Sequence, residues 1–293
     1  MNKIQLFLLI VVLNCNPTLS QELMPPAINS SLPEFGGSLA TTGKKSHRNS
    51  FYFNRTDSLR TLIDLMQAEL NGNSYLSSTR LPFNTDSYRD IDPFINSDGT
   101  ILYFSSNREQ TDLSKGYNLW QVRLSDTGWG RPEPMPGEIN SEQDEIYCSF
   151  TSKNDIYFTR LDKHSSHIYY SLLKNGKYSP AQKVDLPIHD SIRISNPAIA
   201  PDHSFLIFVS AQLNELPNAD LYYSRNLGNN RWSKPINLGV TVNTSDAEFA
   251  PFVSHDKKWL YFTSERPGIV KNFPIGLRRP GDIYRIRLKN ILP

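Results

Sequence analysis

The sequence lacks a hydrophobic run long enough to cross a membrane. Its longest apolar segment, Ile4–Leu13, falls well short of the roughly 20 residues that a transmembrane helix needs. That segment follows Lys3 and precedes the small residues around Ser20, an order typical of a cleavable signal peptide, although a buried N-terminal strand is the alternative. We expect a signal peptide over residues 1–20 and an exported, periplasmic or secreted chain that does not span the membrane.

Cysteine is equally scarce, with only Cys15 and Cys148 in 293 residues. Cys15 lies within the expected signal peptide, where it would suit a lipoprotein except that Asn14 precedes it in place of a small residue. Cys148 then has no partner for an internal disulfide, so packing must stabilise the exported chain. A catalytic thiol is conceivable, but a buried thiol within a strand explains Cys148 better.

No excess of charge of either sign is present. The formal net charge is +2, and it falls to +1 without Lys3. There is no basic run or basic helix, so nothing in the sequence favours nucleic acid as a partner.

Recognisable catalytic motifs are also missing. The sequence has no Gly-x-Ser-x-Gly elbow, and spacing alone identifies no carboxylate pair at glycosidase separation, so we assign no catalytic residue and no cofactor. His164 and His167 could begin a metal site, but no third ligand follows by spacing, and we expect loop histidines rather than a metal. His203 and His255 each adjoin an Asp in a predicted turn, which favours a turn-forming role over catalysis.

What the chain does contain is many aromatic residues, 14 Tyr and 15 Phe, in a pattern that repeats. A Leu-Tyr-Phe-like segment recurs five times, and its second aromatic lies 50 to 54 residues from the next. The anchors are Phe53, Phe104, Phe158, Phe208 and Phe262. A constant period of this length indicates a repeat fold.

Each repeat contains four strand-like pieces. Strand a carries a Pro-Phe segment such as Asp90–Phe94, and strand b is the Leu-Tyr-Phe segment. Strand c is Tyr117–Leu124 in the second repeat, and strand d follows a Gly or Asn turn, as in Gly128–Pro132. Four short antiparallel strands per repeat make one blade of a β-propeller. In the first repeat, residues 58–70 also show helical spacing, but the repeat frame places a strand there.

The repeat motif resembles a known family. Asp98-Gly-x-x-Leu-Tyr-Phe-Ser-Ser-Asn-Arg108, then Asp282-Ile-Tyr, Trp232-Ser-x-Pro and Asn243-Thr-x-x-Ala-Glu248, are similar to the WD40-like repeats called PD40. These repeats are related to the propeller of the Tol system and are common in envelope proteins of Bacteroidetes. The resemblance covers about residues 27–288 and implies a propeller, but the family includes scaffolds, binding modules and some carbohydrate-active enzymes.

The two ends of the mature chain are complementary. The last repeat ends at its c strand, Asp282–Leu288, while Leu23–Asn29 has the character of a d strand. An unpaired strand edge is a liability that a ring avoids by closure. We therefore predict an all-β chain over residues 21–293, one five-bladed β-propeller of four-stranded antiparallel blades, closed by an N-terminal strand.

One face of such a propeller bears the d-to-a and b-to-c loops, and we call it the loop face. Here the b-to-c loops are the long ones, as in Ser106–Gly116 and Glu265–Gly281, whereas the turns of the opposite face, the turn face, are short. Binding residues concentrate on variable loops, so the loop face is the predicted binding face.

Two charged positions recur on the loop face. The acidic position opens strand a and is occupied by Glu34, Asp90, Glu145, Ile194 and Glu248. The basic position follows strand b and is occupied by Arg55, Arg108, Arg160, Gln212 and Arg266. The fourth repeat loses both charges together, as expected if each acid pairs with an Arg. These pairs could hold an anionic or sugar-like ligand around the channel, or could simply pin a loop in every blade, which we favour.

Two functions remain open. The first is a non-catalytic envelope module that binds a protein or glycan partner through the loop face. Its candidate site comprises the charged positions above together with Arg193 and Asn196, because the fourth repeat departs from the others there. The alternative is a carbohydrate-active hydrolase or lyase with its site at the channel mouth.

Overall fold

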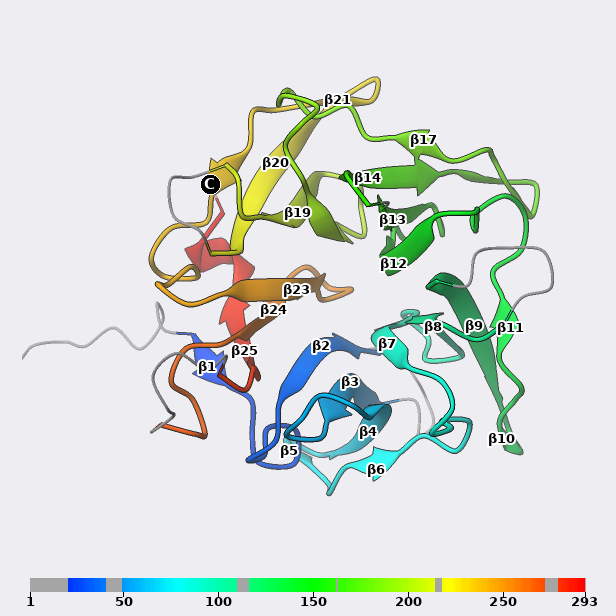
Figure 1. The fold of residues 1–293 in the computed structure, drawn as a ribbon, viewed down its shortest axis with the longest axis vertical. Coiled ribbons are helices and arrows are strands. Elements are labelled where there is room, and N and C mark those ends of the chain that lie inside the picture. The colour runs from blue at the N-terminus through cyan, green and yellow to red at the C-terminus, as the bar shows by residue number, and fades with distance from the viewer. Residues whose placement is uncertain are drawn as a thin grey trace, which may run out of the picture.

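The computed structural model describes residues 21–40, 49–109, 116–161, 163–213, 218–271 and 279–292. The expected signal peptide, Cys15, parts of the b-to-c loops of blades 2 to 5 and most of the a-to-b loop of blade 1 lie outside these residues. That a-to-b loop spans residues 40–49 and is longer than predicted for the turn face. Within them the fold is nearly all β, and five antiparallel sheets are arranged around a central axis (Figure 1). The predicted five-bladed propeller is confirmed.

The blades follow one another along the chain, each listed from strand a outward. Blade 1 contains β2 (Glu34–Leu39), β3 (Ser50–Thr56), β4 (Ile63–Asn71), β5 (Ser74–Tyr75) and β6 (Thr79–Arg80). Blade 2 contains β7 (Asp90–Ile95), β8 (Ile101–Ser106), β9 (Asn118–Ser125), β10 (Gly128–Trp129) and β11 (Glu133–Pro134). Blade 3 contains β12 (Asp144–Phe150), β13 (Ile156–Leu161), β14 (Ser166–Ser171), β15 (Leu173–Lys174), β16 (Lys177–Tyr178) and β17 (Gln182–Lys183). Blade 4 contains β18 (Ser195–Ile199), β19 (Phe205–Ser210), β20 (Asp220–Gly228), β21 (Arg231–Trp232) and β22 (Ile236–Asn237). Blade 5 contains β23 (Glu248–Val253), β24 (Trp259–Ser264), β25 (Asp282–Arg287) and β1 (Glu22–Leu23), and the 3-10 turn η2 (Leu288–Asn290) follows β25.

The outermost strands differ from the prediction. Strand d was expected to run from the turn through a proline, as in Gly128–Pro132, but it is split into two short pieces in blades 1 to 4. In blade 2, β10 pairs with one end of β9 and β11 with its middle, and Pro132 lies between them. Proline has no N–H to donate to the ladder, so pairing lapses where it falls.

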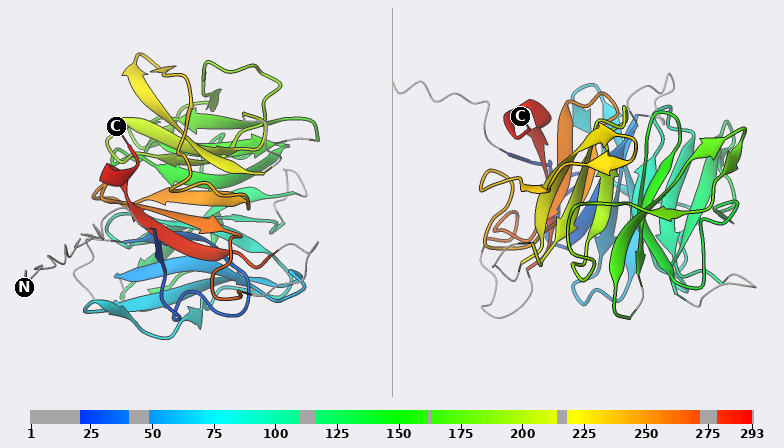
Figure 2. Two further views of the ribbon diagram at one scale, coloured as in Figure 1. Left: turned by 90° about the vertical axis from the view of Figure 1, so that its left-hand side faces the viewer. Right: turned by 90° about the horizontal axis from the view of Figure 1, so that it is seen from above.

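The N-terminal segment closes the ring as predicted, but its strand is Glu22–Leu23 rather than Leu23–Asn29, because Pro25 and Pro26 cannot donate to the ladder. Glu22 and Leu23 pair with Arg285 and Tyr284 of β25, so β1 becomes the outer strand of blade 5. The two ends of the described chain therefore lie side by side (Figure 2). The Asn29 side chain also bonds both backbone groups of Ile283, at 2.9 Å to the carbonyl and 2.8 Å from the N–H.

The core lies between the blades, where the predicted anchor aromatics stack against strand c. All five anchors are essentially inaccessible to solvent, and three of them stack on a Tyr of strand c in their own blade. Those pairs are Phe158 with Tyr169, Phe208 with Tyr222 and Phe262 with Tyr284. Residues 63–71 form strand β4 rather than a helix, because Leu65 packs in one hydrophobic cluster with Phe104 and Ala68 in another with Phe53.

Every innermost strand bulges at the same place. The register slips once in each strand a, at a residue with positive φ that lies two positions after the recurrent acidic position. These bulge residues are Gly36, Asp92, Tyr147, Asn196 and Ala250, with φ between 48° and 58°. A bulge turns its strand and redirects its side chains, here toward the propeller axis.

Candidate functional site

The charged positions of the loop face form the four predicted ion pairs. In each pair the carboxylate is completely or almost completely buried and the guanidinium is largely so. The N–O distances are 2.6 Å for Arg55–Glu34, 2.6 Å for Arg108–Asp90, 2.7 Å for Arg160–Glu145 and 3.2 Å for Arg266–Glu248. The pairing is confirmed, and it leaves these carboxylates little freedom to bind a ligand.

Each pair also holds the d-to-a loop that precedes it. In blade 3, Arg160 donates to the carbonyl of Ile139 at 3.0 Å, while Glu145 accepts from the backbone and hydroxyl of Ser141. Burial raises the pKa of Glu145, although the hydrogen bonds from Ser141 and the charge of Arg160 oppose this. The neighbouring Asn140 bonds both backbone groups of Leu119 on strand c. The Asn-Ser/Thr-x-x-x-Glu motif thus encodes a loop clamp, and it recurs at Asn29 and Asn243.

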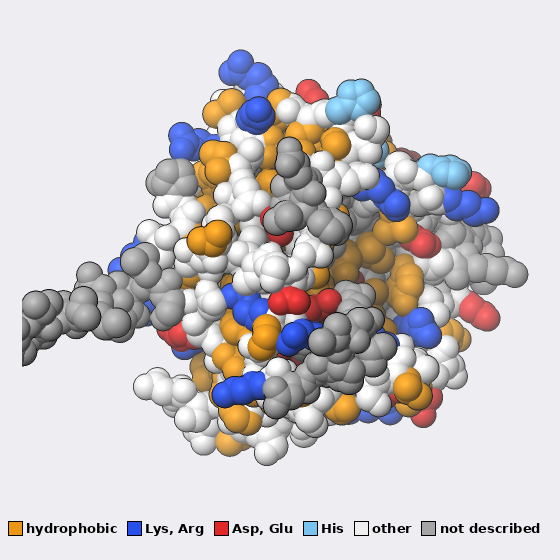
Figure 3. Space-filling model, turned by 60° about the vertical axis from the view of Figure 1, so that its left-hand side comes forward, with side chains coloured by type: hydrophobic (Ala, Val, Ile, Leu, Met, Phe, Trp, Pro, Cys, Tyr) orange, Lys and Arg blue, Asp and Glu red, His pale blue; other side chains and the backbone are white. Residues whose placement is uncertain are grey.

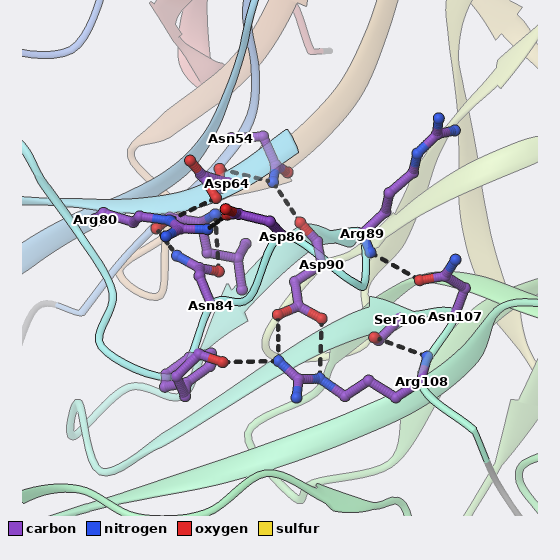
Figure 4. Close-up of polar contacts among 12 residues, drawn as sticks. Asn54, Asp64, Arg80, Asn84, Asp86, Arg89, Asp90, Ser106, Asn107 and Arg108 are labelled. Carbon is purple, nitrogen blue, oxygen red and sulfur yellow. Dashed lines mark hydrogen bonds and ion pairs between the residues drawn. The ribbon is translucent and has the colours of Figure 1, made fainter. Parts of the chain in front are cut away.

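Blade 2 shows the clamp with an aspartate. The Arg108 guanidinium faces both oxygens of Asp90, at 3.1 and 2.6 Å, and donates to the Phe83 carbonyl at 2.8 Å (Figure 4). Nearby, Arg80 bridges Asp64 and Asp86 in a much more exposed position. Arg80 belongs to β6 of blade 1 and Arg108 follows β8 of blade 2, so the two neighbouring blades offer an exposed and a buried ion pair for comparison.

Blade 4 replaces the ion pair with a neutral clamp. The Gln212 side-chain oxygen accepts from the backbone N–H of Arg193 at 2.6 Å, and Ser210 donates to the Arg193 carbonyl at 3.0 Å. Ile194 is buried in place of the acid. Gln212 thus serves the same loop, and the Arg193 side chain is exposed on the loop face.

Asn196 has a structural task that the sequence did not indicate. In four blades, the residue after the anchor Phe accepts the bulge N–H of the next blade through its side-chain oxygen. The acceptors are Asn54, Ser105, Thr159 and Thr263, at 2.8 to 3.2 Å. Blade 4 has Val209 at that position, which cannot accept, and the Asn196 amide oxygen accepts the Ala250 N–H instead, at 2.9 Å. The bulge N–H groups and their acceptors thus form a ring of hydrogen bonds between neighbouring blades. In the fourth repeat, Asn196 takes the place of the missing acceptor at Val209, which explains why this repeat differs from the others.

A small cavity lies on the axis, bounded by the innermost strands of all five blades. Its volume is about 30 Å³, and among the described residues Asp92 is the only charged one that lines it. Asp92 was not among the predicted site residues, although an Asp aligned with Gly36 and Asn196 signals the positive φ that these residue types tolerate. Its pKa is raised well above the usual value because it is buried.

Aromatic side chains close this cavity toward the turn face. The ring centroids of Phe94 lie 5.2 Å from Phe150 and 5.7 Å from Phe252. His255 packs against Phe94 and Phe252 and donates from Nε2 to the carbonyl of Ile95 at 3.0 Å. A second hollow of about 180 Å³ lies beyond them, so the aromatic layer separates it from the axial cavity.

A larger hollow, about 600 Å³, lies on the turn face where blade 5 meets blade 1. Trp259 lines it, but the guanidinium carbons of Arg285 and Arg287 lie 4.4 and 4.0 Å from its ring centroid. Arg285 is itself paired with Glu22 at 2.7 Å. The Trp259 ring and the Arg285 guanidinium could contact a ligand in this hollow, but both already contact other side chains of the protein.

The remaining candidate residues from the sequence are Cys148, His164 and His167. Cys148 is buried in β12, and burial raises the pKa of its thiol, as expected of a structural cysteine. His164 is exposed and His167 lies in β14. In the described ranges, no group of three or more His, Cys, Asp or Glu residues is placed to hold a metal. Nor does that part of the chain contain a helix with the length and apolarity to cross a membrane.

Exposed apolar side chains gather on the loop face at blades 5 and 1. Of the nine exposed large hydrophobic residues in the described part of the chain, five lie on d-to-a or b-to-c loops there. They are Leu32, Leu59, Leu62, Val240 and Ile269. The b-to-c loops of the two blades touch, because Arg60 donates to the Arg279 carbonyl at 2.8 Å. Basic and acidic side chains lie beside each other on the surface in Figure 3, without a field of one sign.

The sequence matches no protein-family model and no curated protein. Several solved structures share the fold. A TolB-like protein from Agrobacterium tumefaciens has a TM-score of 0.53 and 12% identity over 90% of this chain and 80% of its own. An α-L-arabinofuranosidase from Lactobacillus brevis has a TM-score of 0.56 and 13% identity over 90% and 92%. A thermostable family-43 glycoside hydrolase has a TM-score of 0.56 and 10% identity over 91% and 92%. At these identities the likeness establishes the fold alone.

Proposed function

We propose that this chain is an exported envelope module of the PD40 type that binds a protein partner through the loop face at blades 1 and 5. The observation that carries the proposal is the group of exposed apolar residues there, Leu32, Leu59, Leu62, Val240 and Ile269. Apolar side chains gathered on one face, beside paired charges, are typical of interaction surfaces.

The loop clamps support the same function. Each buried ion pair anchors the base of a d-to-a loop, so Leu32 and Val240, which lie on such loops, stand on a preorganised support. Preorganisation lowers the entropy lost on binding and so increases affinity. The ion pairs thus act indirectly, by holding the loops, rather than as ligands to the partner. A glycan partner is less well matched, because apolar aliphatic side chains offer it neither stacking nor hydrogen bonds.

The hydrolase alternative has weaker support. Glycoside hydrolysis generally requires two carboxyl groups flanking the scissile bond. Among the described residues that line the axial cavity, Asp92 is the only acid, and a volume of about 30 Å³ does not admit a sugar ring. The chain thus shares its fold with two glycosidases, but the described residues of the axial cavity do not supply the two carboxyl groups that glycoside hydrolysis needs. Release of sugar from an arabinan by the purified protein, abolished by Asp92→Asn, would restore the alternative.

The binding proposal is tested by capture of partners from the native envelope, followed by mass spectrometry. The test variant is Leu59→Gln with Leu62→Gln, which removes two apolar side chains from the loop face. The control is Leu227→Gln on the turn face, because Leu227 is 53% exposed and Leu62 is 52% exposed. Each buried Leu contributes about 1.5–3 kcal/mol, so the test variant should weaken capture at least tenfold. Equal capture by both variants, or no specific partner for the wild-type protein, would exclude this surface.

A further inference from the structure

Asp92 is an anomaly among the buried acids. Its side chain is only 6% exposed, and neither carboxylate oxygen has a hydrogen-bond partner among the described residues. The four acids of the loop clamps are buried to a similar degree, but each of them is paired with an arginine. A buried carboxylate without a partner is costly, so its retention calls for a ligand.

The bulge geometry points this carboxylate into the axial cavity. Its Oδ1 lies 3.7 Å from the position that a Cβ on Gly36, in the neighbouring blade 1, would occupy. Two of the other bulge residues are small, and the same position on Gly36 lies 3.8 Å from the Cβ of Ala250. Gly36 and Ala250 thus leave room near the charge, whereas Tyr147 of blade 3 is large. The other described residues that line the cavity are uncharged.

The contents of the cavity follow from its size and its charge. About 30 Å³ exceeds the roughly 10–15 Å³ that one water needs, so the cavity can hold a single small species with its hydration. No Lys, Arg or His among the described residues lines the cavity to neutralise Asp92. Burial raises the pKa of the Asp92 carboxyl, so a cation that binds there displaces its proton, and binding should strengthen as the pH rises.

We propose that the axial cavity is a binding site for one hard metal cation, with the Asp92 carboxylate as its charged ligand. Hard cations take oxygen ligands, and Ca²⁺ in particular accepts irregular geometry completed by backbone oxygens and water. With one carboxylate the site is weak, with a dissociation constant on the order of 10⁻⁴–10⁻³ M, as in extracellular calcium modules. The aromatic layer of Phe94, Phe150 and Phe252 blocks the turn face, so the cation enters from the loop face.

Such a cation would bind where the innermost strands of all five blades meet. It would therefore bind only the closed ring and stabilise it, because a ligand specific for the folded state raises the melting temperature. This consequence does not depend on the identity of the protein partner.

The test is thermal unfolding of the purified protein, stripped with chelator, in 0 and 10 mM CaCl₂ at constant ionic strength and neutral pH. At ten times the dissociation constant, the expected rise in Tm is about 3 °C. MgCl₂ and NaCl series show whether the site prefers another hard cation, and an Asp92-dependent response to any of the three supports the proposal. Equilibrium dialysis with Ca²⁺, or with the cation that gives the largest response, should give one ion per chain.

Asp92→Asn is the matched variant. It removes the charge with almost no change of shape, and Asn tolerates the positive φ of 58° at this bulge. We expect it to fold, to lose the rise in Tm, and to bind no cation in dialysis. The proposal is overturned if the wild-type protein binds no cation, or if the variant binds one equally well.

Discussion

Arginines that look alike in the sequence differ widely in burial and therefore in their contribution to stability. The Arg108 side chain is 13% exposed and pairs with an inaccessible Asp90, whereas Arg80 is 42% exposed. The period of the repeat located the four clamp pairs, because both partners recur at fixed offsets. It could not locate Asp92, since the partner of that residue is not another side chain.

We expect Arg108→Ala to lower the free energy of unfolding by about 3 kcal/mol, because it leaves Asp90 buried without a partner. Arg80→Ala should cost less than about 1 kcal/mol, because solvent screens its pairs with Asp64 and Asp86. Urea denaturation of the two variants measures both values. Equal losses would mean that the loop clamp contributes no more than a surface ion pair.

Two partly buried histidines should make the fold sensitive to acid. Burial lowers the pKa of His203, which bonds the Tyr157 hydroxyl, and that of His255, which lies in the aromatic layer. The unfolded chain therefore binds protons near the ordinary pKa of 6.5 that the folded chain does not. The resulting stability is complete above that pH and is lost as the pH falls through the lowered folded pKa values.

The expected loss is up to about 1.4 kcal/mol per pH unit for each histidine. Unfolding free energies at pH 7.5, 6.5 and 5.5 test it, with His255→Gln as the comparison, because Gln retains a donor for the Ile95 carbonyl. The variant should show a shallower fall. Glu34 and Glu145, whose pKa values are raised by burial, favour the fold in acid but are common to both proteins. Identical pH profiles would contradict the account of His255.

At the scale of elements, strands a to c were predictable and strand d was only partly so. Aromatic and β-branched residues recur with the period in the inner three strands because each packs into an interblade core. Strand d lies at the blade edge, where fewer contacts constrain the sequence and prolines such as Pro132 interrupt pairing. The bulges were not predicted, since their residue types vary from Gly36 to Tyr147 and only their backbone conformation is shared.

The hydrogen-bonded ring between blades permits a sharp test at the one place where it departs from the pattern. Asn196→Gly keeps the positive φ but removes the acceptor of the Ala250 N–H, and should cost about 1–3 kcal/mol. Adding Val209→Thr introduces a hydroxyl where Thr159 supplies one in blade 3, and should restore most of the loss. Val209→Thr alone should not stabilise the fold, because Asn196 already accepts that bond. If the double variant is no more stable than Asn196→Gly, the idea that Asn196 replaces an acceptor missing at Val209 is contradicted.

For the whole molecule, closure by the N-terminal segment was predictable because the two ends carried complementary halves of one blade. The segment does more than pair strands, since Met24 and Ile28 are buried and Asn29 bonds both backbone groups of Ile283. The sequence predicted that a partner would bind the loop face, but not which part of that face. Which loops carry its apolar residues depends on side-chain exposure, which the repeat pattern does not specify.

A chain that begins at Ser30 should therefore melt at least about 10 °C lower, since it loses two buried side chains and exposes the edge of β25. Glu22→Ala removes only an exposed ion pair with Arg285 and should change Tm by less than about 2 °C. Scanning calorimetry of both proteins decides the matter. Unchanged melting of the shortened chain would show that closure is not required for stability.

The central claim is that a protein partner binds the loop face at blades 1 and 5. Hydrogen exchange of the protein, with and without the partner captured from the envelope, tests it most directly. We expect added protection in the loops that carry Leu32, Leu59, Leu62 and Val240, and none in the turns around Gly128, Gly176 or Asn229. Protection confined to those turns would contradict the claim and transfer the binding surface to the turn face.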